Sequence, residues 1–297
     1  MEKIKISNRL SLSRIVQGFW RLTNWNYTTD ELIRFMHTCI DMGITTFDTA
    51  EIYGRTVCET LMGKAFKKDP VLIKRIELVT KTGIFEKEIS GEKIGYYNTR
   101  YSRVIQSCKE SITRLGIDKI DLYLIHREDL CFNPWDTGRA LEELQKEGLV
   151  LEIGVSNFDP FKFEALNAAV NGKLVTNQIE WNPICFEHFN SGMIDYLAMK
   201  KLHPMIWSPL AGGKLFDNSC QRSLNVMKKV TEIAKRHNAQ IESILYAWIL
   251  YHPVEAIPIS GSRNVERIRR AVKGLDIKLD HAEWYELYTA SGQQTLR

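Results

Sequence analysis

The 297 residues are 44% hydrophobic and 26% charged, so the chain is long and apolar enough to bury a full core. A net charge of +4 is spread along the sequence without a Lys/Arg block, which disfavours nucleic acid as a partner. Neither an N-terminal signal region nor an apolar run of about 18 residues is found, so we expect a cytoplasmic protein with no membrane partner. The six cysteines lie far apart with no Cys-x-x-Cys, which indicates neither a zinc site nor a disulfide framework.

The chain opens with two short apolar segments, residues 3–6 and 10–12, on either side of a polar turn. This pattern predicts a small β-hairpin ahead of the main fold. A capping box, Thr28-x-x-Glu31, then starts a helix whose apolar residues recur at helical spacing until Gly43. We expect that stripe to face the core.

From there, segments of strand length alternate with segments of helical period. Strands are predicted near residues 14–18, 43–47, 76–81, 121–126, 151–157, 174–178, 205–208 and 256–260. Helices are predicted over residues 32–40, 58–66, 104–115, 141–147, 194–199, 224–236 and 241–251, with another beginning at Asp159-Pro160. Eight strand–helix units predict an α/β fold, a closed (β/α)₈ TIM barrel with an N-terminal hairpin and extra C-terminal helices. The alternative is a doubly wound sheet. No linker rich in Pro, Gly or Ser divides the chain, so we expect a single domain over residues 1–297.

Polar residues stand where several of these strands end. Asp48, Lys81 and His126 each follow an apolar run, and Tyr53 comes five residues after Asp48. Each has an ordinary structural explanation on its own, as a helix cap, a solvated strand end or a core histidine. In a barrel the strand ends share one face, and there these residues would converge. Further polar residues at strand ends are Ser156, Asn157, Gln178 and Ser260.

Asp, Tyr, Lys and His without metal ligands or a nucleophile motif suit proton transfer to a carbonyl oxygen. The pKa of a free tyrosine is near 10, and a neighbouring Lys81 ammonium would lower that of Tyr53. Asp48 would keep Lys81 charged and in place, and a neutral His126 would orient the substrate oxygen. No protein group supplies hydride, so a reduction requires a nicotinamide cofactor.

The sequence contains no Gly-x-Gly-x-x-Gly, so a Rossmann site is not indicated. A phosphate would instead suit residues 259–267, where a strand, a Gly turn and a helix start carry Arg263 and Arg267. An ordinary charged surface helix is an equally good interpretation of this segment.

The chain resembles the aldo-keto reductase superfamily over nearly its whole length. The motifs that carry the resemblance are Phe47-Asp48-Thr49-Ala50-Glu51-x-Tyr53-Gly54, Thr80-Lys81, Asp121-Leu122-x-Leu124-Ile125-His126, Gly154-Val155-Ser156-Asn157-Phe158, Asn177-Gln178 and Pro258-x-x-Gly261-Ser262-Arg263. It looks closest to a bacterial oxidoreductase branch of that family. The resemblance implies NADPH-dependent reduction of a small-molecule aldehyde or ketone by the tetrad Asp48, Tyr53, Lys81 and His126, with Tyr53 as the general acid.

The resemblance also implies a cofactor site. Ser156, Asn157 and Gln178 would hold the nicotinamide carboxamide, Trp207 would stack on its ring, and Arg263 and Arg267 would contact the 2′-phosphate of NADP(H). Further cofactor contacts are implied for Ser208, Leu210, Ser260, Gly261, Ser262 and Glu266. Two departures stand out: Trp207 replaces a tyrosine of many relatives, and Arg270-Ala271 replaces a Glu-Asn pair at the adenine end.

Two other functions stay open. An NADPH-binding module that senses redox state would keep the barrel but turn over slowly. An isomerase or aldolase would use Lys81 as a Schiff-base amine. The substrate is not readable, because the segments expected to form the pocket loops, residues 20–27, 86–100, 132–135 and 212–222, carry no recognisable code.

Overall fold

The computed structural model describes residues 1–90, 92–217 and 220–293. Its strands are β1 (Lys3–Lys5), β2 (Ser11–Ser13), β3 (Val16–Gly18), β4 (Thr46–Asp48), β5 (Glu77–Thr82), β6 (Ile84–Ile89), β7 (Glu92–Tyr97), β8 (Ile120–Ile125), β9 (Val150–Ser156), β10 (Leu174–Glu180), β11 (Met205–Trp207) and β12 (Ile257–Ser260). Its helices are α1 (Thr29–Asp41), α2 (Val57–Lys68), α3 (Tyr101–Leu115), α4 (Pro134–Lys146), α5 (Pro160–Ala169), α6 (Glu187–Asn190), α7 (Met193–Lys200), α8 (Gln221–Arg236), α9 (Ile241–Tyr251), α10 (Val265–Lys273) and α11 (His281–Ala290), with 3₁₀ turns η1 (Leu22–Trp25) and η2 (Ala211–Phe216).

Eight strands close into a barrel in the order β10, β11, β12, β3, β4, β5, β8, β9. The predicted (β/α)₈ barrel is therefore confirmed, and the doubly wound alternative is wrong. The N-terminal hairpin is also confirmed, because β1 pairs antiparallel with β2 and places Ile4 opposite Leu12. By the clustering of its contacts, the chain divides into two compact units, Met1–Gln178 and Ile179–Arg297.

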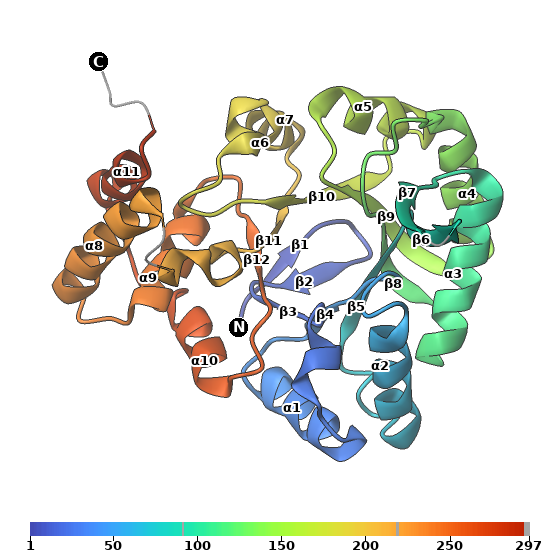
Figure 1. The fold of residues 1–297 in the computed structure, drawn as a ribbon, viewed down its shortest axis with the longest axis horizontal. Helices are drawn as coiled ribbons and strands as arrows, with labels where there is room; N and C mark the ends of the chain where they lie inside the picture. Colours follow the sequence, from blue (N-terminus) through green and yellow to red (C-terminus); the bar gives the residue numbers. More distant parts are fainter. Residues whose placement is uncertain (91, 218–219, 294–297) are drawn as a thin grey trace. The chain divides into compact units, whose positions relative to one another are not determined.

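In the first unit, helices α1 to α4 lie on the outer side of β4, β5, β8 and β9 (Figure 1). The α1 capping box forms as predicted, with Glu31 N–H donating to Thr28 Oγ1 over 3.3 Å and Thr28 N–H donating to the Glu31 carboxylate over 2.8 Å. Helices α2 and α3 approach closely at Gly63, where a Cβ would lie 2.1 Å from the carbonyl oxygen of Arg114. Only glycine permits that approach.

The second unit has an aromatic core between α9 and α11. The rings of Trp248 and Trp284 stack at 5.1 Å between centroids with an interplanar angle of 11°. Each indole N–H donates to the carbonyl of the other tryptophan, over 2.9 and 3.1 Å. This reciprocal pair satisfies both buried indole donors while it buries two large rings.

Two expectations from the sequence are wrong in detail. Residues 86–100, expected to be a loop, mostly form the antiparallel hairpin β6–β7, in which Phe85 lies opposite Tyr96. Helix α4 begins at Pro134 and not near residue 141, because Asn133 caps it by accepting from Trp135 N–H and Asp136 N–H. Its first two turns were missed because the apolar spacing starts only later in the helix.

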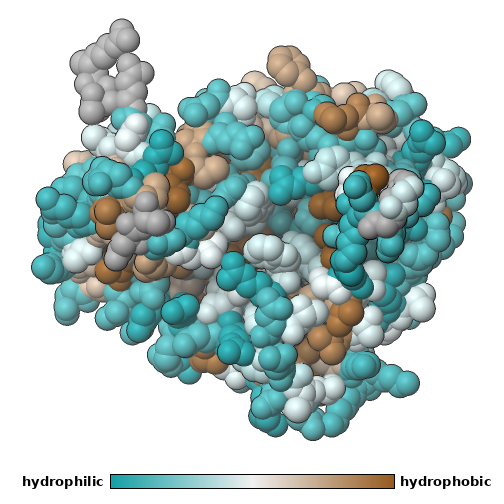
Figure 2. Space-filling model, viewed as in Figure 1, coloured by the Kyte–Doolittle hydropathy of each residue, from teal (hydrophilic) through white to brown (hydrophobic). Residues whose placement is uncertain are grey.

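The face of the molecule in Figure 2 is mostly hydrophilic, with hydrophobic side chains in small separate groups. Leu130, Trp135 and Phe161 are among the exposed apolar residues. Among residues 1–90, 92–217 and 220–293, no helix is long and apolar enough to span a bilayer.

Candidate active site

Three of the predicted acid–base residues stand at the carboxyl ends of neighbouring strands in the first unit. Asp48 is the last residue of β4, Lys81 is next to last in β5, and His126 directly follows β8. The parallel registers align these ends, since Asp48 pairs with Val79 and Lys81 pairs with Leu124. The backbone N–H of His126 extends the ladder by donating to the carbonyl of Thr82 over 2.8 Å.

The ammonium of Lys81 has three hydrogen-bond acceptors. It donates to Asp48 Oδ1 over 2.6 Å, to the carbonyl of Thr49 over 2.8 Å and to the Tyr53 hydroxyl over 3.2 Å. Lys81 is 0% exposed and Asp48 is 3% exposed, so both charges are removed from water. A buried ammonium with three acceptors in place is fully satisfied and held in one orientation.

Tyr53 lies in the tight connection between β4 and α2. Its ring meets that of His126 edge to face, with centroids 5.7 Å apart. The following residues Gly54, Arg55 and Thr56 all adopt left-handed backbone conformations, with φ of 56°, 53° and 70°. Gly54 has no room for a side chain, because a Cβ would lie 2.5 Å from Thr23 Cγ2.

Burial sets the direction of the pKa shifts of Tyr53 and His126. It raises the pKa of Tyr53, and Asp48 adds to the rise, whereas Lys81 lowers the pKa without reversing the net increase. Lys81 therefore lowers the pKa of Tyr53 as expected, but burial outweighs it and the net shift is upward. Burial, Lys81 and Arg127 together hold the pKa of His126 well below its ordinary value, so its imidazole is neutral at physiological pH, as expected.

Lys81 shows the opposite balance. Burial lowers its pKa, but attraction to Asp48 and Tyr53 and the hydrogen bonds to both outweigh that effect and raise it. An amine must lose its proton before it can attack a carbonyl carbon. The raised pKa of Lys81 therefore disfavours the Schiff-base alternative.

The residues expected around the carboxamide are connected to this cluster. Gln178 Nε2 donates to Asp48 Oδ2 over 2.8 Å. Ser156 Oγ donates to the carbonyl of Gln178 over 2.8 Å, and Asn157 Nδ2 donates to Ser156 Oγ and to the His126 carbonyl over 2.8 and 3.2 Å. Amide and hydroxyl groups both donate and accept, which is the chemistry a nicotinamide carboxamide requires. Among the described residues, the buried Nδ1 of His126 has no hydrogen-bond partner.

The other predicted cofactor residues lie in the second unit, at the ends of two paired strands. Trp207 ends β11 and is partly exposed, and Ser208 and Leu210 follow it. Ser260 ends β12, which pairs in parallel with β11. Gly261, Ser262 and Arg263 then lead into α10, which carries Glu266 and Arg267 in its first turn.

The start of α10 differs in one respect from the predicted phosphate site. The Asn264 side chain caps the helix by accepting from the N–H groups of Glu266 and Arg267, over 2.9 and 3.2 Å. Those two backbone donors are therefore already engaged. The exposed side chains of Arg263 and Arg267 remain as the cationic groups of this segment. Arg270, which replaces a residue expected near the adenine, forms an ion pair with Glu242 over 2.8 Å.

The sequence did not predict the contacts that hold Lys81, Asp48 and Tyr53 in place. It did not foresee the Thr49 carbonyl on Lys81, nor the bond from Gln178 to Asp48. It also gave no role to Glu51, which is 4% exposed and lies two residues before Tyr53. A carboxylate inside the same motif, next to apolar residues, was the one available signal for Glu51.

Asp48, Tyr53, Lys81 and His126 thus gather beside the carboxyl ends of β4, β5 and β8 in a closed parallel barrel, the end at which barrel enzymes carry their active sites. Residues 14–290 match the family model described as the Aldo/keto reductase family. The chain belongs to this family, whose members are oxidoreductases.

Relatives support the same family. The chain is 39% identical to the uncharacterized oxidoreductase YcsN of Bacillus subtilis, with 98% of each chain covered. It is 37% identical to a 6-dehydroglucose reductase of Agrobacterium fabrum, with 97% of each covered. Among solved structures it resembles a thermostable aldo-keto reductase in complex with the inhibitor epalrestat, with a TM-score of 0.82, 26% identity, and 98% of this chain and 100% of that chain covered.

Proposed function

We propose that the chain reduces aldehydes or ketones to alcohols, with NADPH as hydride donor and Tyr53 as general acid. The observation that carries the proposal is the 3.2 Å hydrogen bond between the Tyr53 hydroxyl and the Lys81 ammonium, itself held 2.6 Å from Asp48. Family membership and the reductases among the relatives support the reaction class.

Each residue of the tetrad has a distinct task in this proposal. When bound, the nicotinamide supplies a hydride to the carbonyl carbon. The Tyr53 hydroxyl gives its proton to the carbonyl oxygen, and the phenolate left behind is stabilised by the Lys81 ammonium. Asp48 keeps Lys81 charged and in place. Neutral His126 donates a hydrogen bond to the substrate oxygen and so places it within reach of Tyr53.

The proposed cofactor site consists of the residues that the sequence predicted. Ser156, Asn157 and Gln178 hold the carboxamide, and Trp207 stacks on the nicotinamide ring. The 2′-phosphate is assigned to Arg263 and Arg267, since guanidinium groups bind phosphate through charge-assisted hydrogen bonds. Further contacts are proposed for Ser208, Leu210, Ser260, Gly261, Ser262 and Glu266.

Turnover by a carbonyl panel tests the proposal. NADPH oxidation is followed with nitrobenzaldehydes, 1,2-diones and 6-dehydroglucose, and cofactor binding is measured separately by fluorescence. The Tyr53→Phe variant should lose about 10²- to 10⁴-fold in kcat, the usual contribution of a general acid, while its NADPH affinity stays near that of the wild type. Bound cofactor without reduction of any carbonyl, or full turnover by Tyr53→Phe, contradicts the proposal.

A further inference from the structure

The loop that carries Tyr53 is strained. Three consecutive residues after Tyr53 have positive φ, and Thr56, at 70°, is β-branched. For residues other than glycine, this conformation brings Cβ too close to the following carbonyl oxygen and is unfavourable. Such strain persists only where neighbouring structure holds the backbone in place. The contacts of this loop therefore show what fixes the position of the phenol.

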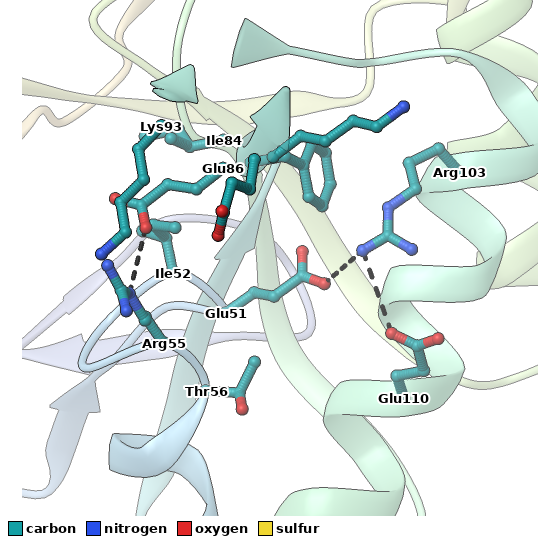
Figure 3. A pocket seen from close by; sticks show the side chains of 12 residues that line it. Glu51, Ile52, Arg55, Thr56, Ile84, Glu86, Lys93, Arg103 and Glu110 are labelled. Atoms are coloured by element: carbon teal, nitrogen blue, oxygen red, sulfur yellow. Dashed lines mark hydrogen bonds and ion pairs between the residues drawn. The ribbon is translucent and has the colours of Figure 1, made fainter. Parts of the chain in front are cut away.

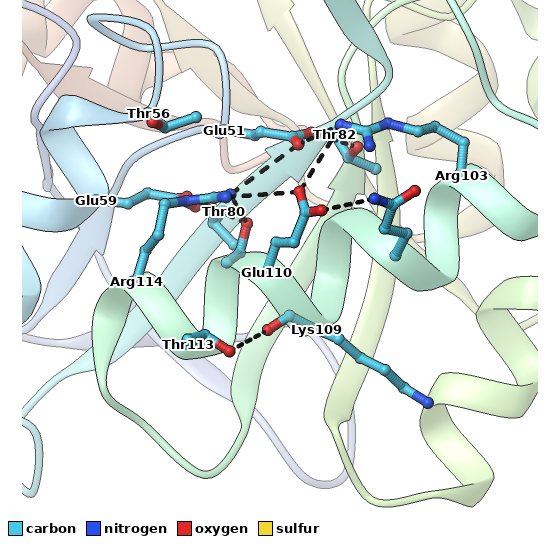
Figure 4. Close-up of polar contacts among 12 residues, drawn as sticks. Glu51, Thr56, Glu59, Thr80, Thr82, Arg103, Lys109, Glu110, Thr113 and Arg114 are labelled. Atoms are coloured by element: carbon cyan, nitrogen blue, oxygen red, sulfur yellow. Dashed lines mark hydrogen bonds and ion pairs between the residues drawn. The ribbon is translucent and has the colours of Figure 1, made fainter.

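Glu51 provides the most buried of these contacts. Its carboxylate accepts from Thr82 Oγ1 over 2.8 Å and from Arg103 Nη2 over 2.9 Å, and its backbone N–H donates to the Lys81 carbonyl over 3.0 Å. Thr82 directly follows Lys81, and alternate residues of a strand point to opposite faces. One side chain therefore ties the Tyr53 loop to the face of β5 opposite Lys81. Figure 4 shows the Glu51 carboxylate beside Thr82 and Arg103.

Arg103 is fixed by more than Glu51. Its guanidinium lies 4.1 Å from the centroid of the Phe85 ring in β6 and 3.9 Å from the Glu110 carboxylate. A second pair, Arg55 with Glu86 at 3.0 Å, connects the same loop to the same hairpin. These side chains line a cavity of about 370 Å³ (Figure 3).

The cavity itself does not indicate a ligand, because its charged lining residues balance. The cations are Arg55, Lys87, Lys93 and Arg103, and the anions are Glu51, Glu86, Glu88 and Glu110. These charges are better explained by the ion pairs that hold the Tyr53 loop against α3 and the β6–β7 hairpin than by binding of a ligand.

We propose that Glu51, held by Arg103, is a positioning residue that sets the distance between Tyr53 and Lys81. This inference rests on the proposed function. A shift of the Glu51 carboxylate would move Tyr53, two residues away, relative to Lys81. The backbone N–H of Glu51, which donates to the Lys81 carbonyl, would move with it. Misplacement of a reacting group by about 1 Å can cost 10²-fold in rate. Glu51 touches neither hydride donor nor substrate in this scheme.

The test compares Glu51→Gln, Arg103→Met and Arg103→Lys with a matched control, Glu152→Gln. Glu152 is also 4% exposed and also accepts from an arginine, Arg9, over 2.9 Å, but it lies near the start of β9. Steady-state kinetics, NADPH affinity and Tm are measured for each. The Tyr53 phenol is titrated by NMR of ¹³C-labelled tyrosine, with its signal assigned from Tyr53→Phe.

We expect Glu51→Gln and Arg103→Met to lose about tenfold or more in kcat, with KM and NADPH affinity within about threefold of the wild type. The Tyr53 titration should move in both variants. Arg103→Lys should recover part of the loss, because it restores the ion pair but not the planar contact with Phe85. Glu152→Gln should lower Tm without altering kcat or the Tyr53 titration.

The proposal is overturned if the Tyr53 titration is unchanged in Glu51→Gln, or if kcat falls no more than in Glu152→Gln. If Glu51→Gln does not fold, the contrast between Arg103→Met and Arg103→Lys decides in the same way. The NMR titration needs no turnover. A wild-type protein that reduces no carbonyl would therefore contradict the proposed function, whereas the positioning role would still be decided by the Tyr53 titration.

Discussion

Tyr53 and Lys81 share a hydrogen bond, and the buried surroundings and the Lys81 ammonium act on the Tyr53 phenol in opposite directions. Reduction needs a protonated phenol before the reaction and a stabilised phenolate after it. Burial favours the first by raising the pKa of Tyr53, and the ammonium 3.2 Å away favours the second. The site therefore keeps the Tyr53 phenol protonated and places the positive charge of Lys81 beside it, as the proposed reduction requires.

The pH dependence of reduction follows from these shifts. In the proposed reduction Tyr53 acts in its protonated form, which is populated below its pKa, so kcat should hold through neutral pH and fall only as pH rises past the ordinary tyrosine value of about 10. His126, with its pKa well below normal, should add no titration near pH 6 to 7. A pH–rate profile with saturating cofactor measures both. A loss of kcat centred near pH 8 would contradict the assignment.

For single residues, the sequence predicted which side chains come together but not the net direction of the pKa shift of Tyr53. Asp48, Lys81 and His126 converge because each stands at the carboxyl end of a strand of one barrel. The net direction of the pKa shift of Tyr53 could not be predicted, because it depends on how completely the folded protein excludes water from the phenol. The contact of Gln178 with Asp48 joins residues that are 130 positions apart, so no local pattern encodes it.

Among the secondary-structure elements, α2 and α3 depend on one glycine for their approach. Gly63→Ala should destabilise the protein by about 1–3 kcal/mol, the usual cost of overpacking, because its Cβ would meet the backbone oxygen of Arg114. Gly95→Ala in β7 is the control, since a Cβ there meets nothing closer than 4.0 Å. Urea unfolding of both variants measures the difference. Equal midpoints would show that the two helices can move apart at little cost.

Helix α10 and the segment just before it carry the proposed phosphate contacts, Arg267 and Arg263. Arg267→Ala and Arg263→Ala should weaken NADPH binding more than NADH binding, because only NADPH carries the 2′-phosphate. Lys273→Ala, in the last turn of the same helix, removes an equal charge and should affect neither cofactor appreciably. Fluorescence titration gives the affinities. If both arginine variants weaken NADPH and NADH equally, the phosphate assignment is wrong.

The order of strands and helices was predictable because apolar spacing and capping signals agree along most of the chain. The β6–β7 hairpin was missed because every residue of β7 is exposed, so this strand lacks the alternating apolar face that marks a half-buried strand. Asn264 shows a further limit. A residue that looks like part of an anion site by sequence can instead satisfy the helix donors itself.

For the whole molecule, closure of the barrel was inferred correctly from eight repeating units. Single-domain organisation over residues 1–297 stays a prediction, and we propose that the two compact units unfold together. Their transitions should then coincide when followed by probes in each unit. Separate midpoints would show two domains.

The stacked pair Trp248 and Trp284 offers an optical probe for that experiment. Two indoles held 5.1 Å apart and almost parallel should couple their electronic transitions and give a distinctive ultraviolet circular dichroism signal. The signal should vanish when α9 and α11 separate, and Trp284→Phe should remove it without unfolding. It would report the second unit alone, without an added label, while the ¹³C signal of Tyr53 reports the first.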